Sequence, residues 1–468
     1  MGLHHGITNS IVSSITCTMQ GEKPTLLKGT RDFSAPQVFR RNYIFDTIRH
    51  IYQKYGFLPL ETPVLEHLTT LTGKYGEEGD QLLFKILNSG DFLEGVDSHT
   101  KDYKALLPQI AAKGLRYDLT VPLMRYVAMN RDKLIFPFKR YQMQPVWRAD
   151  RPQKGRYREF YQCDIDIVGT SSLLCEAEIL VMIHEVLLQL GVKDFTIHMN
   201  HRDVLKGLTT LAGATNQEGS LCVALDKLDK VGKDKVLEEL KGKGFVPAAL
   251  ERLSFIFDLP TAQVDRWSVL AKQLGPTQKG MQDMRKILDY VHDLGLEEPS
   301  ITLDPTLARG LSYYTGTIFE VKMKHSDWGS LGGGGRYDGL TDVFGLTGVS
   351  GVGFSFGLDR LYSALEALDL FPSSIGPTTQ VLLANLDHAS EKWALKVLTT
   401  LRINDIWAEI YPAIVKLKKQ LQYAHKRQIP FVAIIGEEEH AAGVVTLKDM
   451  RTGTQQQYSL EQVLQELS

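Results

Sequence analysis

Residues 137–169 constrain what this chain can fold into more than any other stretch of the sequence. Residues 141–147 and 160–168 are rich in apolar, aromatic and β-branched side chains, which is typical of strands. The loop that joins them holds five Arg or Lys residues and is interrupted by Pro152 and Gly155. One interpretation is a hairpin with a solvated cationic tip, which is the ordinary meaning of a charge run.

The second of these strands favours another interpretation. Gln162, Asp164 and Asp166 alternate with apolar residues, so they are expected to share one face of a sheet. An acidic face beside a group of arginines suits a ligand that has both a cationic and a polyphosphate part. Arg in particular makes planar, bidentate contacts with phosphate. The stretch therefore predicts the floor and wall of a binding site.

These strands and their loop resemble motif 2 of the class II aminoacyl-tRNA synthetases. Residues 151–162 are similar to the histidyl-tRNA synthetases in particular, and they read RPQKGRYREFYQ. The resemblance covers about residues 25–465, and the three class II motifs occur in order. The other matching segments are GTRDF at 29–33, a motif 1-like helix and strand at 36–65, RYDLTVP at 116–122, RGLSYY at 309–314, LGGGGRYDG at 331–339 and the motif 3-like GVSGVGFSFGLDRL at 348–361.

The resemblance implies a class II synthetase-like fold of three parts. The first is an α+β catalytic domain built on an antiparallel sheet, from residues 25–202 and 301–372. Residues 203–300 show helical periodicity and predict a helical insertion, which either clamps the tRNA acceptor arm or is a solvated subdomain without a partner. After a Ser, Gly and Pro linker at 373–377, residues 377–468 alternate strands with helices, which predicts an α/β domain with a mostly parallel sheet. That domain resembles the anticodon-binding domain of these enzymes.

Length, charge and cysteine content limit the number of domains, the kind of partner and the cellular compartment that are expected. A chain of 468 residues exceeds one ordinary core, so two or three domains are expected. The formal net charge of −2 shows that the chain is not basic as a whole, so a nucleic acid such as tRNA must bind to local basic patches. The four cysteines form neither a metal-type pair nor a disulfide framework, which indicates a reducing, cytoplasmic setting. Residues 1–24 carry no targeting pattern and are expected to be a disordered leader, and no membrane span is predicted.

The resemblance also implies roles for individual residues. Arg148 and Arg309 are implied to be catalytic, holding the α-phosphate of ATP from two sides. Arg148, Arg156 and Arg360 are the implied ATP-binding residues, while an ordinary ion pair with Asp304 is the alternative for Arg309. The implied contacts of histidine are Asp118, Leu119, Thr120, Arg148, Gln162, Asp166, Arg309, Tyr313, Tyr314 and Tyr337. No permanently bound cofactor or protein metal site is expected, since Mg²⁺ binds through ATP phosphates.

Three features keep a structural interpretation beside the functional one. Asp118 and Thr120 either cap the helix that Pro122 begins or accept from the α-ammonium group of an amino acid. The glycines at 332–335 form either a flexible link or a strand that a ligand approaches closely. The unit at 36–65 is either an ordinary helix–strand pair or the interface of a homodimer, as the resemblance implies.

The function that the resemblance implies is that of a histidine–tRNA ligase. Such an enzyme activates L-histidine with ATP to histidyl-adenylate and transfers it to the 3′ end of tRNA(His). The alternative is a non-catalytic synthetase-like regulator that senses histidine or uncharged tRNA, and a synthetase of another specificity is a third interpretation. The Arg309-Gly310-Leu311 run and the C-terminal α/β domain favour the ligase, because such regulators usually lack one of them.

Overall fold

A computed structural model of the protein describes most of the chain. The described residues are 23–96, 102–153, 155–215, 217–225, 227–260, 262–275, 278–296, 300–308, 313–324, 329–376 and 379–467. The predicted leader at 1–24 therefore lies outside them up to residue 22, and residues 23 and 24 have no regular secondary structure. Lys154 of the basic loop and Arg309 also lie outside the described residues.

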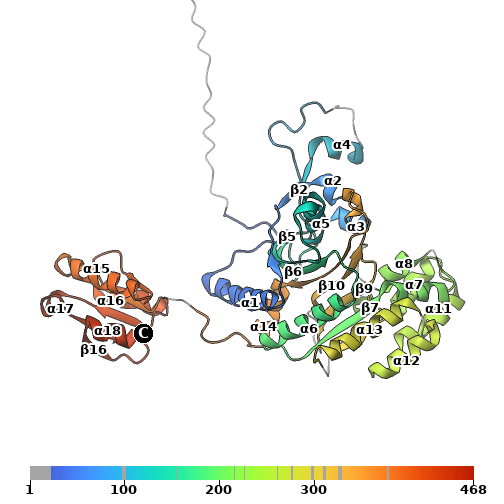
Figure 1. The fold of residues 1–468 in the computed structure, drawn as a ribbon. Helices are drawn as coiled ribbons and strands as arrows, with labels where there is room; N and C mark the ends of the chain where they lie inside the picture. Colours follow the sequence, from blue (N-terminus) through green and yellow to red (C-terminus); the bar gives the residue numbers. More distant parts are fainter. Residues whose placement is uncertain are drawn as a thin grey trace, which may run out of the picture.

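An eight-stranded sheet forms the centre of the molecule (Figure 1). The strand order is β1-β5-β6-β11-β10-β9-β7-β8, and every neighbouring pair is antiparallel except β1–β5 and β7–β8. The strands are β1 (Leu58–Pro59), β5 (Phe138–Trp147), β6 (Glu159–Val168), β7 (Phe195–His201), β8 (Ile301–Leu303), β9 (Thr317–Met323), β10 (Ser330–Asp338) and β11 (Ser350–Gly357). The largely antiparallel sheet predicted for this part of the chain is thus confirmed.

Alternation along β6 separates the core of this sheet from its open face. Cys163, Ile165 and Ile167 are at most 1% exposed and belong to one large hydrophobic core. This face is covered by three helices that contact one another or the sheet, namely α1 (Ala35–Lys54), α6 (Leu174–Gln189) and α14 (Leu358–Ala367). The polar residues of β6 are therefore left on the opposite face, where a ligand can reach them.

Helix α1 shows how the sequence builds the covering layer. The Ser34 N–H donates to the side chain of Gln37 at 2.9 Å, which is one half of a capping box at the helix start. Ile44 and Ile48 lie one turn apart and are fully buried. Each such side chain stabilises the fold by about 1.5–3 kcal/mol through its burial. The sequence predicts a helix over residues 36–55, and the structure confirms it to within one residue at each end.

The sequence predicts a strand over residues 58–65, with Pro59 and Pro63 marking an edge or a bulge. The edge is confirmed at β1, but the single strand is wrong. β1 ends at Pro59 on the edge of the main sheet, and β2 (Leu65–His67) belongs to a separate sheet of order β2-β4-β3. Pro59 and Pro63 lack the N–H that a continuous ladder requires, which explains the break.

The small sheet is surrounded by short elements. Residues 74–86 contain one short helix and one short strand. The elements of this region are α2 (Leu68–Leu71), α3 (Gly76–Gln81), β3 (Lys85–Ile86), α4 (Tyr103–Ile110), β4 (Lys113–Leu115), α5 (Thr120–Asn130) and the 3₁₀ turn η1 (Arg131–Lys133). The lobe that carries α4 projects from the main sheet and its helices in Figure 1.

The described residues between β7 and β8 are helical, as the periodicity predicted. They form α7 (Arg202–Leu211), α8 (Glu218–Leu225), α9 (Leu228–Val231), α10 (Lys233–Gly242), α11 (Pro247–Leu253), η2 (Ser254–Phe257), α12 (Gln263–Leu274) and α13 (Lys279–Asp293). Helix α13 contacts α6, which covers the main sheet, as well as α7, so the insertion shares its hydrophobic core with the main sheet.

The C-terminal part has its own sheet and its own cores. The order is β13-β12-β14-β15-β16; β12 is parallel to both neighbours, and β15 and β16 run antiparallel. The prediction of a mostly parallel sheet is therefore wrong beyond β14. Parallel strands need a crossover of about a dozen residues or more, and only residues 435–443 separate β14 from β15. The elements of the C-terminal part are β12 (Val381–Leu383), α15 (His388–Ile403), β13 (Ala408–Ile410), α16 (Leu417–Lys426), β14 (Phe431–Ile434), α17 (Glu437–Ala442), β15 (Val444–Asp449), β16 (Gln455–Ser459) and α18 (Leu460–Leu467).

Candidate active site

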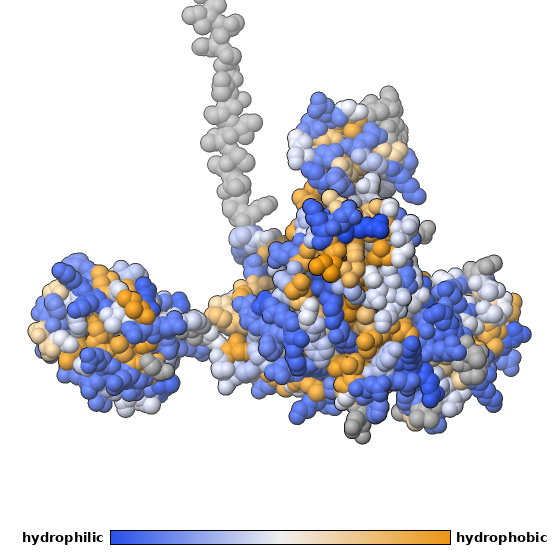
Figure 2. Space-filling view, viewed as in Figure 1, coloured by the Kyte–Doolittle hydropathy of each residue, from blue (hydrophilic) through white to orange (hydrophobic). Residues whose placement is uncertain are grey.

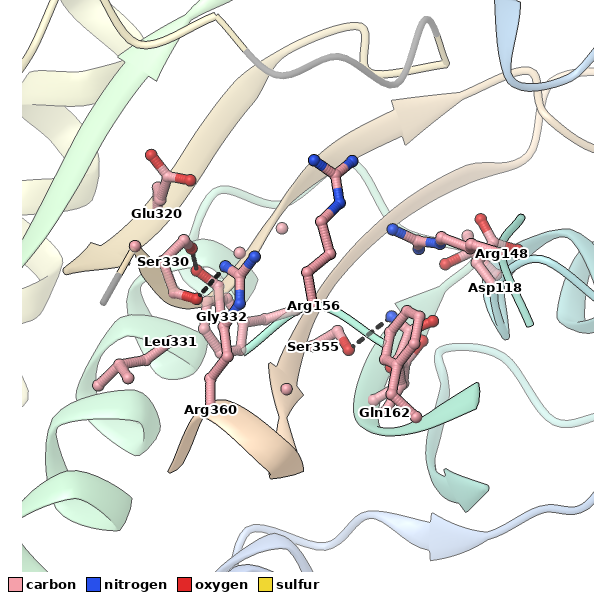
Figure 3. Close-up of a pocket in the computed structure, with 18 of the residues that line it drawn as sticks. Asp118, Arg148, Arg156, Gln162, Glu320, Ser330, Leu331, Gly332, Ser355 and Arg360 are labelled. Carbon is pink, nitrogen blue, oxygen red and sulfur yellow. Dashed lines mark hydrogen bonds between the residues drawn. The ribbon is translucent and has the colours of Figure 1, made fainter. Parts of the chain in front are cut away.

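A cavity of about 880 Å³ opens on the polar face of the main sheet (Figure 3). Its floor comes from β6, β10 and β11, and its walls come from the loop between β5 and β6, the start of α5 and residues 304–308. Leu225 and Leu228 of the helical insertion also line it. Its size is that of a site for small molecules.

The floor carries the three polar residues of β6 that the alternation predicted to lie together. Gln162, Asp164 and Asp166 all line the cavity. Gln162 Nε2 donates to Ser355 Oγ at 2.8 Å, which fixes the amide of Gln162 against β11. Gln162 Oε1 and Asp164 Oδ1 are buried and have no hydrogen-bond partner in the described part of the chain. Buried polar atoms of this kind usually have partners, so they mark where a ligand or water would bind.

Asp166 is held by one neighbour on each of its two carboxylate oxygens. Arg140 is fully buried and places Nη2 at 2.8 Å from Asp166 Oδ2, and the Tyr337 hydroxyl donates to Asp166 Oδ1. Burial raises the pKa of both Asp164 and Asp166, and the charge of Arg140 opposes that shift. One buried cation therefore faces two carboxyl groups. This end of the cavity favours a ligand that donates N–H groups.

Asp118 lies at the same end of the cavity and is 2% exposed. Its Oδ1 accepts from the Tyr75 hydroxyl and from the Val121 N–H, both at 3.1 Å, and its Oδ2 accepts from the Tyr313 hydroxyl at 3.2 Å. Burial raises the pKa of Asp118, against these hydrogen bonds and the charge of Arg148. The bond to Val121 means that Asp118 caps the helix and also faces the cavity, so its two interpretations are compatible.

Of the two residues after Asp118, Thr120 lines the cavity and Leu119 does not. Thr120 lines the cavity, but it is the first residue of α5, so the helix begins there and not at Pro122. Leu119 is fully buried in the core, and its carbonyl accepts from Arg140 Nη2 at 3.1 Å. Leu119 is not among the residues that line the cavity.

Three tyrosines form the wall between the acidic groups. Tyr313, Tyr314 and Tyr337 all line the cavity, and the last two are no more than 7% exposed. The rings of Tyr313 and Tyr314 have centroids 4.9 Å apart, and Tyr313 meets Tyr337 edge-on at 6.2 Å. Burial raises the pKa of Tyr313 and Tyr337 well above the ordinary value, so both hydroxyls stay protonated and can donate.

The arginines lie along the rest of the cavity. Figure 3 shows Arg148 beside Asp118, with Arg156 and Arg360 further along. Arg148 Nε donates to the Tyr117 carbonyl at 3.1 Å, and the guanidinium lies 4.2 Å from the centre of the Tyr117 ring. Arg360 Nη1 donates to the Ser330 carbonyl at 2.5 Å.

Arg156 is exposed and pairs with Asp150 at 2.9 Å, which keeps its guanidinium beside the cavity that both residues line. Three guanidinium groups along one cavity match a chain of phosphates.

The glycines at 332–335 belong to β10, so the flexible-link interpretation is wrong. A Cβ on Gly334 would lie 2.0 Å from the Gly353 carbonyl oxygen on β11. A Cβ on Gly353 would in turn lie 2.1 Å from Asp166 Oδ1. Glycine is needed at both positions because the strands and the floor carboxylate approach so closely.

Sequence reasoning left several cavity residues unassigned. Asp164 was placed on the correct face by the alternation but was given no role. Tyr75 and Ser355 were given none either, although Ser355 lies in the motif 3-like segment. The implied contacts of Arg309 cannot be placed, but Ala308 and Tyr313, the nearest described residues on either side, both line the cavity.

The largely antiparallel sheet with a cavity on its open face, followed by a separate C-terminal domain, is the fold of a class II aminoacyl-tRNA synthetase. The chain belongs to the histidyl-tRNA synthetase family, whose model matches residues 29–361. An anticodon binding domain model matches residues 380–468.

Relatives and solved structures agree with this assignment. The chain is 52% identical to the histidine–tRNA ligase of Cytophaga hutchinsonii, over 95% of this chain and all of that protein. It is 48% identical to the corresponding ligase of Phocaeicola vulgatus, over 94% of this chain and 98% of that protein.

The histidyl-tRNA synthetase of Nostoc sp. PCC 7120 superposes with a TM-score of 0.78 at 31% identity, covering 96% of this chain and 99% of that one. An ATP phosphoribosyltransferase regulatory subunit/histidyl-tRNA synthetase of Bacillus halodurans has a TM-score of 0.70 at 21% identity, covering 89% and 98%, and shows the fold alone.

Proposed function

We propose that this cavity activates L-histidine with ATP and that the chain then transfers the histidyl group to tRNA, as a histidine–tRNA ligase. The observation that carries the proposal is one cavity with buried carboxylates at one end and three arginines along the rest. Histidine has an ammonium group and an imidazole, and ATP has a chain of phosphates, so the two ends match the two substrates. The catalytic family domain and the ligases at 52% and 48% identity favour the ligase over the regulator.

The acidic end would select histidine. Asp118 and Thr120 would accept from the α-ammonium group, and Gln162 would contact the amino-acid backbone. Asp166 would accept from an imidazole N–H, with Tyr313, Tyr314 and Tyr337 around the ring. A site built to pair both ring nitrogens discriminates strongly, because a wrong side chain leaves its buried polar groups unpaired.

The arginine end would hold the triphosphate during adenylation. A carboxylate oxygen of histidine attacks the α-phosphorus, and the bond to the bridging oxygen breaks as pyrophosphate leaves. Arg148, and Arg309 by resemblance, would neutralise the charge on the α-phosphate, while Arg156 and Arg360 would bind the β- and γ-phosphates. A terminal ribose hydroxyl of tRNA then attacks the carbonyl carbon of the adenylate, and AMP leaves.

ATP is a substrate here, and Mg²⁺ would enter with it. Within the described residues, no group of three or more His, Cys, Asp or Glu side chains could cage a metal ion. Mg²⁺ retains waters and binds through phosphate oxygens in sites of this kind. Mg²⁺ would add charge neutralisation on the phosphates, while Arg156 and Arg360 would hold the same groups from the protein side.

Amino-acid-dependent ATP–pyrophosphate exchange across all the amino acids tests the proposal. We expect exchange with histidine alone. Exchange with a different amino acid would reassign the specificity. Binding of histidine without any exchange would favour the regulator.

Asp166→Asn should weaken histidine binding far more than ATP binding. The substitution removes the charge from a buried hydrogen bond to the imidazole, which costs on the order of 2–3 kcal/mol. We therefore expect the histidine KM to rise by roughly 30–150-fold and the ATP KM to stay within about threefold. Asp338→Asn is a control, since Asp338 ends β10 outside the cavity. An unchanged histidine KM would make Asp166 a structural residue.

We propose a homodimer as the assembly of this chain. Large apolar side chains are exposed near the free edge of the main sheet, where β1 is the last strand. Figure 2 shows apolar surface gathered over the region where β5 and α5 lie in Figure 1. The exposed fractions are 64% for Leu58, 37% for Val64, 47% for Leu65, 72% for Met129 and 88% for Ile135. A second copy would cover both this surface and the open strand edge.

Ile135→Glu should shift the protein from dimer to monomer. A charge at the centre of a dry apolar contact is desolvated without a partner, so we expect the dimer dissociation constant to rise at least about tenfold. Light scattering across a dilution series measures this. Ile403→Glu is the matched control, because Ile403 is 79% exposed but belongs to the C-terminal part. A stable, fully active wild-type monomer would refute the dimer.

Transfer of the histidyl group requires tRNA, and we propose that the C-terminal domain binds the anticodon end of the tRNA. We also propose that the protein acts in the cytoplasm. Lys418, Lys419 and Lys426 lie on α16, with Lys416 before it and Arg427 after it, and together they supply a local basic patch. Among the described helices, none is both long and apolar enough to cross a bilayer.

A further inference from the structure

Residues 28–33 run against the loop that carries the phosphate-binding arginines. The Gly29 carbonyl accepts from the Arg158 N–H at 2.9 Å, and the Arg158 carbonyl accepts from the Arg148 N–H at 2.9 Å. The Lys28 carbonyl also accepts from Arg158 Nη1 at 3.3 Å. A chain of backbone hydrogen bonds therefore joins this segment to Arg148.

The contact between the segment and the loop leaves no room for a side chain. Gly29 has φ of +92°, a conformation that favours glycine. A Cβ at this position would lie 2.8 Å from Arg158 Cγ and 3.0 Å from Pro152 Cγ. The segment is thus fitted to the outer side of the loop.

Arg31 extends from this segment to two different parts of the site. Its Nη2 lies 2.6 Å from Asp359 Oδ1, at the start of α14. Its guanidinium carbon lies 3.2 Å from the centre of the Tyr157 ring, in the loop. Tyr157 and Asp359 line the cavity, whereas Arg31 does not. Arg31 can therefore act on the cavity through these two residues.

Asp359 is a rigid anchor for this contact. It is 4% exposed, and its Oδ1 also lies 2.6 Å from Nη1 of the buried Arg41. Its Oδ2 accepts from the Tyr161 N–H on β6 at 3.3 Å. Asp359 directly precedes Arg360, so the anchor and a proposed phosphate ligand share the first turn of one helix.

We propose that residues 28–33 are a positioning segment for the ATP site, with Arg31 as the positioning residue. Arg31 fixes Tyr157 against Asp359 and thereby holds the loop of Arg148 and Arg156 at its distance from Arg360. This inference rests on the proposed function of the cavity. It extends that function to a segment that does not line the cavity. Positioning matters here because cations that are already in place do not have to reorganise during the reaction.

Arg31→Ala should act on ATP and not on histidine. We expect the ATP KM in histidine-dependent pyrophosphate exchange to rise about 5–20-fold, in line with the loss of a partly buried cation–π contact and ion pair. The histidine KM should stay within about twofold, since the residues proposed to bind histidine do not contact Arg31. Arg31→Lys should restore part of the loss, because it keeps the charge but not the planar fork.

Arg40→Ala is the matched control. Arg40 also pairs with an acid, Glu366 at 3.1 Å, and also lies over a ring, Phe371 at 5.1 Å. It belongs to α1 and touches neither the loop nor Asp359, so its removal should leave both KM values unchanged. Equal losses in Arg31→Ala and Arg40→Ala would make Arg31 a general stability residue, and melting curves of both variants separate the two effects.

A double-mutant cycle tests whether Arg31 acts through Tyr157. Tyr157→Leu should raise the ATP KM, and adding Arg31→Ala should then change it by less than about twofold, since the contact is already lost. Additive effects would overturn the inference, and so would a wild-type ATP KM in both single variants. A wild-type chain without histidine-dependent exchange would instead overturn the proposed function, so the two failures are distinct. If Arg31→Ala does not fold, Arg31→Lys and Tyr157→Leu carry the same test.

Discussion

Arg148→Ala should lower the rate of adenylate formation by roughly 10²–10³-fold, which is the usual cost of removing one preorganised donor from a developing charge. Arg148 is held by its backbone, by the Tyr117 carbonyl and by the Tyr117 ring, so its geometry is set before ATP binds. Within the described part of the chain, no carboxylate or carbonyl accepts from its two terminal nitrogens. These nitrogens are therefore available to a phosphate oxygen.

Single-turnover formation of histidyl-adenylate is the measurement for this prediction. The ATP and histidine KM values should move much less than kcat, because the interaction strengthens as the reaction proceeds. Arg148→Lys should recover only part of the rate, since it lacks the planar fork. Arg151→Ala is the control, as Arg151 is an exposed cation of the same loop that does not line the cavity. Near-normal rates in Arg148→Ala would overturn the proposed mechanism.

The floor of the cavity was predictable because strand alternation is a local rule. Gln162, Asp164 and Asp166 were placed on one face by their spacing alone, and the structure confirms that all three line the cavity. The large antiparallel sheet was predicted mainly through the resemblance, since several of its strands adjoin strands far away in the sequence. Local pattern and family resemblance thus supplied different parts of the prediction.

The partners of Asp118 were not predictable from any local pattern. Tyr75 and Tyr313 donate to it from 43 and 195 residues away. The histidine contact that the resemblance implies for Leu119 stays a prediction, and the residue itself is fully buried and does not line the cavity. The turn into α5 directs its side chain into the core. Contacts that depend on how distant segments meet require the fold itself.

Errors in the predicted elements follow from chain connections. Residues 58–65 were read as one strand because their side chains favour strands, but two prolines remove ladder donors and the chain passes from one sheet to another. The C-terminal sheet was expected to continue in parallel, but the link between β14 and β15 is too short for a crossover. Side-chain preference identified the elements, and connection length decided how they pair.

Removing residues 377–468 should abolish most tRNA charging and leave histidine-dependent pyrophosphate exchange intact. Within the described residues, the C-terminal sheet pairs with no strand of the main sheet, and its hydrophobic cores are separate from the catalytic core. Figure 1 shows the two parts joined by the segment that follows α14. The truncated protein should therefore fold, and its exchange rate should stay within about threefold of the full chain.

The loss of charging should be about 10²-fold or more, because tRNA would lose one of two linked binding surfaces and their combined affinity. Charging of tRNA at fixed enzyme concentration and rising salt measures this. In the full chain, reversing Lys418 and Lys419 to Glu should reproduce part of the loss and reduce the salt dependence of binding. Reversing the exposed Lys392 and Lys396 of α15 is the matched control. Normal charging by the folded, truncated protein would show that the C-terminal domain does not bind the anticodon end of tRNA.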